Sequence, residues 1–519
     1  MNFTSVANIA GGIGLFLLGM FMSTEGLRML AGDSLRRILS RFTGGSLRSI
    51  SLGAVLTVLV QSSHVTTIAT IGFVSAGLIT FQQSLGIIFG ANLGKTSIGW
   101  IISLLGFKLK IGLIAMIALA VGATMKIAFK NYLSKLGFVI AGFGLIFIGI
   151  DFLQNGMNDF GSLFSISNYI DDSIFTRFKL LGIGVIMTVI AQSSGAALTI
   201  TLAAVHLGQI SVEHAAAMVI GQNIGSTLTA AFAAFGASSS AKKTALAHIF
   251  FNLFTGIILF ILLHPFIVFI SGIFSSVIHG EEVIAVSLFH TSFNFVGIIL
   301  FLPFIKYFSS FLSYLIPSKK SFTEHLDKNV ETLPAVAVES ARRSALEIVS
   351  HLCTKCTQIL RTNEMSFNSS EIKNSTAKIA EFMSRVRMHQ GIDYERKRKI
   401  SLLHAVEHID YVTDCADETE TWKNLQRYDL LKNLREDLAA ELDKIILWIN
   451  NKDEKYNAKS IENVSERMIE SRKRVRAKIL ESLSKGEIES EDAFRQIEAL
   501  RWLERLTYRI WRSVYYLID

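Results

Sequence analysis

The chain has 519 residues, a formal net charge of +8 and a mean hydropathy of +0.42, and 18% of its residues are charged. Because soluble proteins carry about 25% charged residues, this composition excludes an ordinary soluble globular protein. Residues 1–316 are apolar and rich in glycine and phenylalanine, whereas residues 319–519 are dense in Lys, Arg, Glu and Asp. We therefore expect a lipid-embedded region followed by a water-solvated one. The sequence has no P-loop, zinc-ligand spacing or G-x-S-x-G motif, so an enzyme is not expected.

The first region contains apolar segments suited to membrane helices, which need about 20 apolar residues each. Polar residues interrupt some of them, so we expect about eight to ten helices. No basic n-region or small-residue cleavage site marks the N-terminus, and the first segment is expected to remain as a membrane helix. The segments lie near residues 6–30, 50–80, 84–105, 111–129, 136–155, 180–207, 215–236, 244–273 and 284–316.

An internal repeat is visible within this region. Setting Gln61 on Gln192, an offset of 131 residues, aligns the tripeptide Q-S-S with a second Q-S-S. The same offset aligns G-A-N-L-G-K-T at residues 90–96 with G-Q-N-I-G-S-T at residues 221–227, and Gly53 with Gly184. We therefore predict one membrane repeat in residues 1–135 and a second, with the final membrane helices, in residues 136–316.

Charge in the two repeats indicates their orientation. The segment after the first helix of the first repeat is rich in arginine, and its counterpart is rich in aspartate. By the positive-inside rule the first segment lies in the cytoplasm and the second outside, which predicts an inverted-topology repeat. Charge drift between parallel repeats is the alternative. The residues are Arg28, Arg36, Arg37, Arg41 and Arg48 in the first repeat, and Asp159, Asp171 and Asp172 in the second.

The Q-S-S tripeptides lie deep inside apolar segments, where an unpaired polar group costs several kcal/mol. Isolated hydroxyls often bond back to their own helix, which is a sufficient account of Thr57 or Thr188. A glutamine and two serines at matching positions of both repeats instead favour a binding site. Its candidate residues are Gln61, Ser62, Ser63, Gln192, Ser193 and Ser194.

The second paired motif places an asparagine, Asn92 or Asn223, between two glycines. We expect the glycines to interrupt a regular helix and to free backbone carbonyls and amides. Hydroxyls at Thr96, Thr227 and Thr229 suit a hard cation such as sodium, and N–H groups at half-helix starts suit an anion. The two motifs together predict a site for an oxyanion beside its coupling cation.

These motifs resemble the type II sodium–phosphate cotransporter family. The resemblance rests on the paired Q-S-S and N-x-G-x-T, on L-A-G-D-S-L-R-R at residues 30–37, and on H-x-x-x-N beginning at His248 and His290. The bacterial branch, whose C-terminal domain is similar to the phosphate-uptake regulator PhoU, is the most similar. The resemblance implies an all-α fold: a polytopic membrane bundle of two inverted-topology repeats with re-entrant hairpins, then a cytoplasmic PhoU-like helical bundle.

The resemblance also implies a secondary active transporter of the bacterial inner membrane that carries inorganic phosphate, coupled to sodium. Phosphate, sodium and lipid would be its partners, without nucleic acid or another cofactor, and a homo-oligomer is compatible with the sequence. By matching motif, phosphate would contact Gln61, Ser62, Ser63, Gln192, Ser193 and Ser194, with Asn92, Asn223 and Lys95 as further candidates. Sodium would be held by Gln192, Ser193, Thr227, Thr229 and Thr96.

The sequence departs from the family at two points. His64 and Gly195 replace a third serine, and Lys95 stands where the family has a small hydroxyl residue. A charge in the membrane is expensive, so Lys95 either occupies a cation position, pairs with phosphate, or extends to the interface from a helix end. If it replaces a cation, the alternative is a sodium-independent phosphate exporter. His64 either responds to pH, because imidazole titrates near neutrality, or is a hydrogen-bonded structural residue, and His248 and His290 are interpreted as helix-packing polar groups.

Residues 317–335 are interpreted as a linker and residues 336–519 as a PhoU-like domain of amphipathic helices. Lys319 and Lys320 follow the last membrane segment, which places this domain in the cytoplasm. The motifs E-H-I-D-Y and E-R-L-T-Y end at Tyr411 and Tyr508, where PhoU proteins have metal-binding aspartates. Metal binding by this domain is therefore not expected, and a regulatory or docking role is expected instead.

A membrane sensor of phosphate status without net transport is a further alternative for the function of the whole chain. The helical spacing of Cys353 and Cys356 predicts core packing.

Overall fold

The structure is a computed structural model, and every element in its described residues is a helix. Residues 1–74 and 78–318 form one compact unit, the membrane unit, and residues 319–519 with 75–77 form the other, the C-terminal unit. The described residues are 3–41, 45–75, 79–106, 112–163, 173–235, 238–275, 281–317, 321–328, 331, 334–362, 368–387, 393–423, 425–451 and 456–518.

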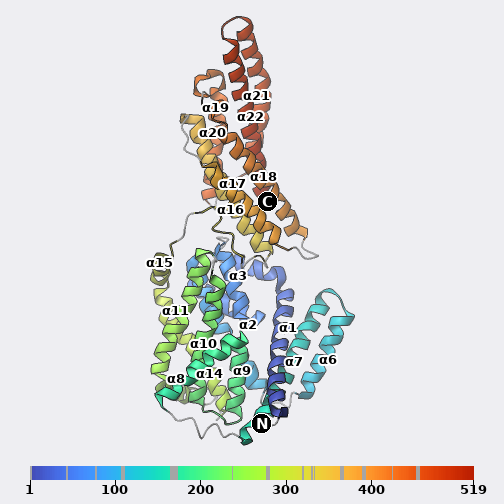
Figure 1. The fold of residues 1–519 in the computed structure, drawn as a ribbon, viewed down its shortest axis with the longest axis vertical. Helices are drawn as coiled ribbons and strands as arrows, with labels where there is room; N and C mark the ends of the chain where they lie inside the picture. Colours follow the sequence, from blue (N-terminus) through green and yellow to red (C-terminus); the bar gives the residue numbers. More distant parts are fainter. Residues whose placement is uncertain are drawn as a thin grey trace. The chain divides into compact units, whose positions relative to one another are not determined.

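The membrane unit contains six described stretches that are long and apolar enough to cross a bilayer, so the chain is a multi-pass membrane protein (Figure 1). These stretches are Phe3–Leu27, Phe81–Leu104, Asn131–Met157, Ile174–Ala191, Ser239–Ile261 and Glu282–Leu315. The helices are α1 (Phe3–Arg41), α2 (Ser46–Val60), α3 (Ser63–Ser75), α4 (Phe81–Gly94), α5 (Ser97–Ile101) with a π-helical turn (Ile102–Gly106), α6 (Gly112–Ala128), α7 (Asn131–Leu163), α8 (Ile174–Ala191), α9 (Ser194–His206), α10 (Val212–Ala234), α11 (Ser239–Ile261), α12 (Leu263–Ile273), α14 (Glu282–Phe301) and α15 (Ile305–Leu315).

Several boundaries differ from those expected. The arginine-rich segment is not a loop after the first helix, because α1 continues to Arg41. Its residues are mostly good helix formers without proline, so nothing ends the helix earlier. Asp159 likewise lies within α7, while Asp171 and Asp172 lie outside the described residues. The expected segments 50–80 and 180–207 are each divided into two helices, which meet at the Q-S-S tripeptides.

Glycines shared by the two repeats allow helix backbones to touch. A Cβ atom on Gly53 of α2 would lie 1.9 Å from the carbonyl oxygen of Ile87 in α4. Its counterpart Gly184 of α8 would place a Cβ 2.2 Å from the carbonyl oxygen of Met218 in α10. Small residues at helix contacts let backbones approach closely, which is the usual basis of helix association in lipid. The repeated glycines therefore hold two helix pairs, α2 with α4 and α8 with α10.

The C-terminal unit is built from long amphipathic helices around an apolar core. Cys353, Cys356 and Cys415 are buried and free, which confirms the core interpretation of these thiols. Burial raises the pKa of Cys356 to about 12 and that of Cys415 to about 11. The helices are α16 (Pro334–Thr362), α17 (Ser369–Arg385), α18 (Asp393–Asp417), α19 (Thr419–Trp422), α20 (Lys432–Asn450), α21 (Lys459–Ser484) and α22 (Ser490–Ile518).

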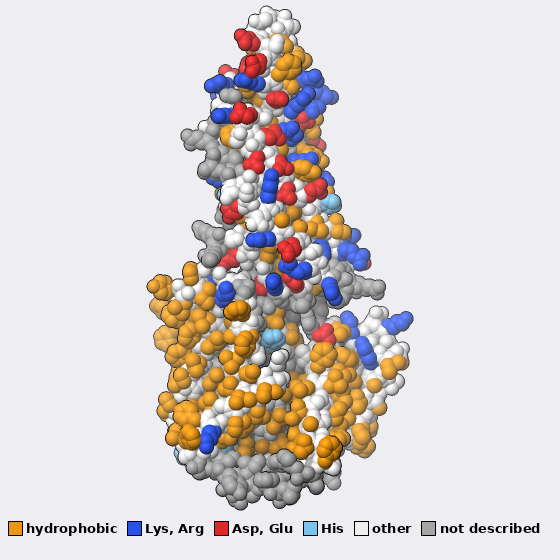
Figure 2. Space-filling view, in the orientation of Figure 1, with side chains coloured by type: hydrophobic (Ala, Val, Ile, Leu, Met, Phe, Trp, Pro, Cys, Tyr) orange, Lys and Arg blue, Asp and Glu red, His pale blue; other side chains and the backbone are white. Residues whose placement is uncertain are grey.

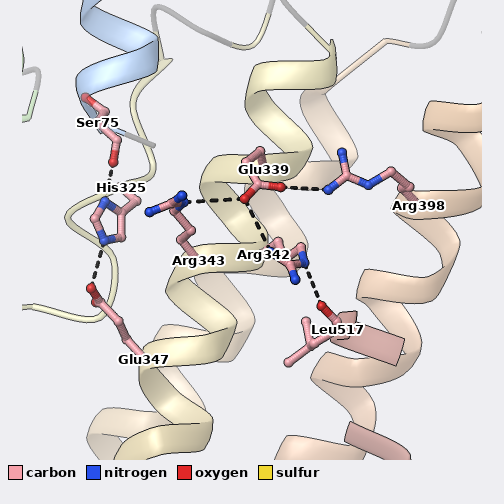
Figure 3. Close-up of polar contacts among 8 residues, drawn as sticks. All are labelled: Ser75, His325, Glu339, Arg342, Arg343, Glu347, Arg398 and Leu517. Atoms are coloured by element: carbon pink, nitrogen blue, oxygen red, sulfur yellow. Dashed lines mark hydrogen bonds and ion pairs between the residues drawn. The ribbon is translucent and has the colours of Figure 1, made fainter. Parts of the chain in front are cut away.

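A buried carboxylate ties three of these helices together (Figure 3). Glu339 of α16 accepts hydrogen bonds from Arg398 of α18 at 2.6 Å and from Arg342 at 3.3 Å. Arg342 in turn donates to the carbonyl oxygen of Leu517 in α22 at 2.6 Å. Burial alone would raise the pKa of Glu339, but the guanidinium charges of Arg342 and Arg398 hold it below its ordinary value. Charged side chains of both signs are scattered over the visible face of this unit, whereas hydrophobic ones dominate that of the membrane unit (Figure 2).

We expect Gly221→Ala to destabilise the membrane unit, because the new Cβ would lie 1.9 Å from the carbonyl oxygen of Leu181. Overpacking of this kind costs about 1–3 kcal/mol. Thermal unfolding of the detergent-solubilised protein measures the change. Gly182→Ala on the adjacent helix is the matched control, since a Cβ there meets nothing within 4 Å. Equal melting temperatures for the two variants would contradict the packing role.

Candidate functional site

Two helices of the membrane unit end at a glutamine in the left-handed conformation. Gln61 follows α2 with φ 54° and ψ 26°, and Gln192 follows α8 with φ 49° and ψ 23°. A positive φ is uncommon outside glycine and costs roughly 1–2 kcal/mol, but it ends a helix sharply. Among the described residues the only other non-glycine with positive φ is Asn131. The two Q-S-S tripeptides are therefore matched helix breaks.

A new helix begins immediately after each break. The Ser62 hydroxyl accepts a hydrogen bond from the backbone N–H of Val65 at 3.3 Å, at the start of α3. The Ser193 hydroxyl accepts one from the N–H of Ala196 at 3.2 Å, at the start of α9. Serine is a favoured N-cap, and a helix start carries a partial positive charge of about half a unit. Each tripeptide thus presents a helix N-terminus together with hydroxyl groups.

Both tripeptides line one cavity of about 410 Å³ in the membrane unit. It is also lined by Ser226, a further hydroxyl of the second N-x-G-x-T motif, and by His248 and His290, to which the sequence assigned no binding role. The H-x-x-x-N spacing pointed to the histidines, and Ser226 occupies the repeat position that matches Lys95. The predicted residues that line the cavity are Gln61, Ser62, Ser63, Lys95, Gln192, Ser193, Ser194 and Thr229.

Lys95 is the cationic side chain of this cavity and only 9% exposed. Its ammonium Nζ donates a hydrogen bond to the Ser226 hydroxyl at 3.3 Å, so it does not extend along the outer surface. The described residues that line the cavity include no aspartate or glutamate. The ammonium therefore has no carboxylate counter-ion there, and the cavity is electrostatically suited to an anion.

The asparagines of the second motif lie behind the cavity lining. The Asn92 amide donates to the carbonyl oxygen of Ile88 at 3.1 Å, and the Asn223 amide donates to that of Val219 at 3.0 Å. The expected helix interruption is found in the first repeat, where α4 ends at Gly94 and Lys95 and Thr96 form a turn before α5, but it is wrong for the second, because α10 passes through its motif unbroken. The physical reason is that the flanking glycines accommodate a neighbouring backbone instead of breaking the helix.

Asn92 nevertheless reaches the cavity through a second residue. Its side-chain oxygen lies 3.0 Å from Nε2 of His248, which lines the cavity. The corresponding oxygen of Asn223 is buried without a hydrogen-bond partner. The two halves therefore differ at this position, although their sequences match.

The threonines of the proposed sodium set bond to their own helices. Thr96 donates to the carbonyl oxygen of Leu93 at 2.8 Å, and Thr227 donates to that of Ile224 at 2.7 Å. Neither is among the residues that line the cavity, whereas Thr229 is. A hydroxyl that donates its proton to a carbonyl keeps its oxygen lone pairs, so this arrangement is compatible with cation coordination.

Comparison with known protein families identifies the family to which the chain belongs. A family model described as Na+/Pi-cotransporter matches residues 15–155 and 164–278, which include both tripeptides and the cavity residue Lys95. The chain belongs to this family. No solved structure matches the chain significantly. The PhoU-like character of the C-terminal unit stays a prediction.

The relatives of this chain carry names that describe different activities. The uncharacterized protein YqeW of Bacillus subtilis is 30% identical over 307 residues, 59% of this chain and 96% of that protein. YjbB of Escherichia coli strain K12, named for inorganic phosphate export, is 24% identical over 354 residues, 66% of this chain and 63% of its own length. The sodium-dependent phosphate transport protein 2A of Ovis aries is 39% identical over 88 residues, 16% of this chain and 14% of that protein.

The left-handed conformation at Gln192 can be tested by substitution. Gln192→Gly should keep the fold, because glycine adopts positive φ without steric cost. Gln192→Val should lower the free energy of unfolding by about 1–3 kcal/mol, because a β-branched residue is strained there. Gln192→Asn, which tolerates this conformation, is the control. Thermal unfolding in detergent is the measurement, and a valine variant as stable as the glycine variant would refute the assignment.

Proposed function

We propose that this member of the Na+/Pi-cotransporter family is a secondary active transporter that carries inorganic phosphate across the bacterial inner membrane, coupled to sodium. The observation that carries the proposal is a cavity with two helix N-termini, five serines and one ammonium, and with no acidic residue among its described lining residues. Hydroxyl groups, helix N-termini and cations are the groups that proteins use to bind phosphate.

Phosphate would lie between the two tripeptides. Ser63 and Ser194 are the first residues of α3 and α9, and their hydroxyls have no capping role. The backbone N–H groups of both helix starts, with these hydroxyls and the Lys95 ammonium, would donate to the phosphate oxygens. An unpaired cation at low exposure is costly, and the anion would supply the missing counter-charge.

Inverted-topology repeats with re-entrant hairpins are supported by two features. α3 and α9 have 13 residues each, hence a length of about 20 Å, which is less than the hydrocarbon core of about 30 Å. Lys95 and Ser226 hold matching positions in the two repeats and contact each other. Equivalent residues meet in this way close to a two-fold axis. We infer that the repeats face each other across the cavity and that alternating access occurs around it.

Sodium would be held beside the anion by oxygen ligands. Gln192, Ser193 and Thr229 line the cavity on the side of the second repeat. Thr227 and Thr96 would contribute hydroxyl oxygens whose protons already go to backbone carbonyls. Neutral oxygens of this type suit a hard monovalent cation.

A sodium-independent phosphate exporter is the second candidate, and the position of Lys95 favours it. An ammonium in the cavity, hydrogen-bonded across the two repeats, would supply permanently the charge that a coupling cation supplies transiently. The relative named for phosphate export is in line with this candidate.

The C-terminal unit is proposed to be a cytoplasmic, PhoU-like regulatory domain. Lys319 and Lys320 follow the last membrane helix, as the positive-inside rule expects of a cytoplasmic segment. The described residues contain no group of three or more metal-ligating side chains, so regulation through helix packing or docking is the proposed role. The alternative of a sensor that does not transport phosphate can be tested by removing residues 319–519. A transporter should keep its phosphate flux after this truncation, whereas a sensor should show none.

Proteoliposomes test the leading proposal. An inward sodium gradient should drive uptake of labelled phosphate, and Ser63→Ala or Ser194→Ala should weaken apparent phosphate affinity by roughly tenfold, because each removes a hydrogen bond to a charged ligand worth about 1.5–3 kcal/mol. Ser62→Ala and Ser193→Ala should weaken it as well, with some loss of helix capping. Thr124→Ala on α6 is the control, since this hydroxyl bonds its own helix away from the cavity. Uptake that ignores sodium and all four serines would reject the proposal.

Lys95→Thr separates the two candidates. If the ammonium replaces a coupling cation, the threonine variant should gain sodium dependence, seen as a steeper rise of phosphate flux with sodium concentration. Lys126→Thr on α6, an exposed lysine outside the cavity, should leave that dependence unchanged. If Lys95→Thr abolishes phosphate binding at every sodium concentration, Lys95 is a phosphate ligand; an unaltered sodium curve with normal phosphate affinity would exclude both roles.

A further inference from the structure

A second group of cationic side chains lies in the C-terminal unit, between α18 and α22. The guanidinium carbon of Arg509 is 3.9 Å from the ring centroid of Tyr411 on α18 and 5.8 Å from that of Tyr508. One turn further along α22, Arg512 lies 4.7 Å from the ring centroid of Tyr516. Tyr411 and Tyr508 are the final residues of the two matched E-x-x-x-Y motifs, so the motifs converge on Arg509.

These two arginines lack the carboxylate partners that neighbouring arginines have. Arg505 forms an ion pair with Glu418, and Arg472 forms one with Glu504, whereas within the described residues neither Arg509 nor Arg512 forms any. The nearby carboxylate of Asp410 accepts a hydrogen bond from Thr376 at 2.6 Å instead. Two half-buried guanidinium groups therefore stand side by side without a counter-ion.

The remaining polar contacts of the cluster leave donors unused. Arg509 donates to Nδ1 of His408 at 3.2 Å, and Arg512 donates to the Tyr516 hydroxyl. Burial, followed by the charges of Arg509 and Arg512, lowers the pKa of His408 to about 4, so its ring is neutral and can accept this hydrogen bond. The Nε atom of Arg512 and the indole nitrogen of Trp511 are buried without partners.

Aromatic stacking prepares an arginine for bidentate binding. A guanidinium held flat against a ring loses less conformational entropy when its N–H edge binds an oxyanion, and this edge matches the geometry of phosphate. Tyr411 and Tyr508 are 40% and 38% exposed, so this side of the cluster is open to solvent. An anion here would provide both the missing charge and acceptors for the unused donors.

We propose that Arg509 and Arg512, framed by Tyr411, Tyr508 and Tyr516, form a binding site for a phosphate-class oxyanion on the C-terminal unit. The site is separate from the membrane cavity and does not depend on the proposed transport activity. The same chemistry fits a dissolved phosphate compound and the phosphate of an anionic lipid headgroup.

The full chain in phosphatidylcholine nanodiscs tests the site by native mass spectrometry and radioligand binding. Inorganic phosphate and ATP are the probes for a dissolved ligand. The double variant R509Q/R512Q should weaken the C-terminal binding component by at least tenfold, because hydrogen bonds between charged groups are lost. Arg509→Lys, which keeps the charge but not the fork of donors, should weaken it in part. Arg501→Gln, an exposed arginine of the same helix, is the matched control.

Two further arms identify the site and the source of the ligand. Ser63→Ala with Ser194→Ala weakens binding in the cavity, so the C-terminal component should persist in that variant and separate the two sites. Nanodiscs that contain phosphatidylglycerol test the lipid source: a headgroup ligand should appear as bound lipid that R509Q/R512Q loses, with phosphate displaced. The proposal is overturned if R509Q/R512Q, folded as judged by an unchanged melting temperature, binds phosphate, ATP and phosphatidylglycerol as the wild type does.

Discussion

The membrane unit is organised around two helices that each stop inside a long apolar segment of the sequence. Backbone groups freed inside hydrocarbon find no water, so a helix can break there only beside a protected polar space. Gln61 and Gln192 make the break with a left-handed residue, and Ser62 and Ser193 cap the helices that follow. Because the breaks recur at matching positions, their polar ends share one cavity. The cavity, the serine caps and the two helix N-termini therefore all follow from the left-handed conformation that Gln61 and Gln192 share.

The buried carboxylate of Glu339 and the buried ammonium of Lys95 differ in whether an opposite charge balances them. In the C-terminal unit, Glu339 is buried among three arginines, and its lowered pKa keeps it ionised. Acidification through that lowered pKa would remove the stabilisation, which is present in full above the pKa of the unfolded carboxyl group. In the membrane cavity, Lys95 donates a hydrogen bond to the Ser226 hydroxyl, and no acidic residue is among the described residues that line the cavity. A buried cation without a counter-ion indicates a site where an anionic ligand can complete the charge balance. A buried charge that is already paired instead has a structural role.

The sequence predicted most of the polar residues that line the cavity, and it was a poorer guide to their surroundings. Repetition of Q-S-S predicted correctly that both tripeptides meet, because polar residues in an apolar segment need partners. The glycines beside Asn223 were misread as helix breakers, although α4 does end at the second glycine beside Asn92, since a single sequence does not reveal which backbone approaches a glycine. The extension of α1 to Arg41 was missed because charge was equated with a loop, although arginine is a good helix former. The contact between His248 and Asn92 was also missed. The two residues lie on different helices, and no local motif in the sequence indicates that these helices meet.

The glycine contacts also limit how the proposed mechanism can move. α2 with α4 and α8 with α10 touch backbone to backbone, so each pair is expected to move as a rigid body and to carry its tripeptide with it. The contact between Lys95 and Ser226 joins equivalent positions of the two repeats. If the repeats rock about the proposed two-fold axis, Lys95 and Ser226 lie close to that axis and are displaced least. In such a motion the ammonium would remain near the anion while access changes from one side to the other.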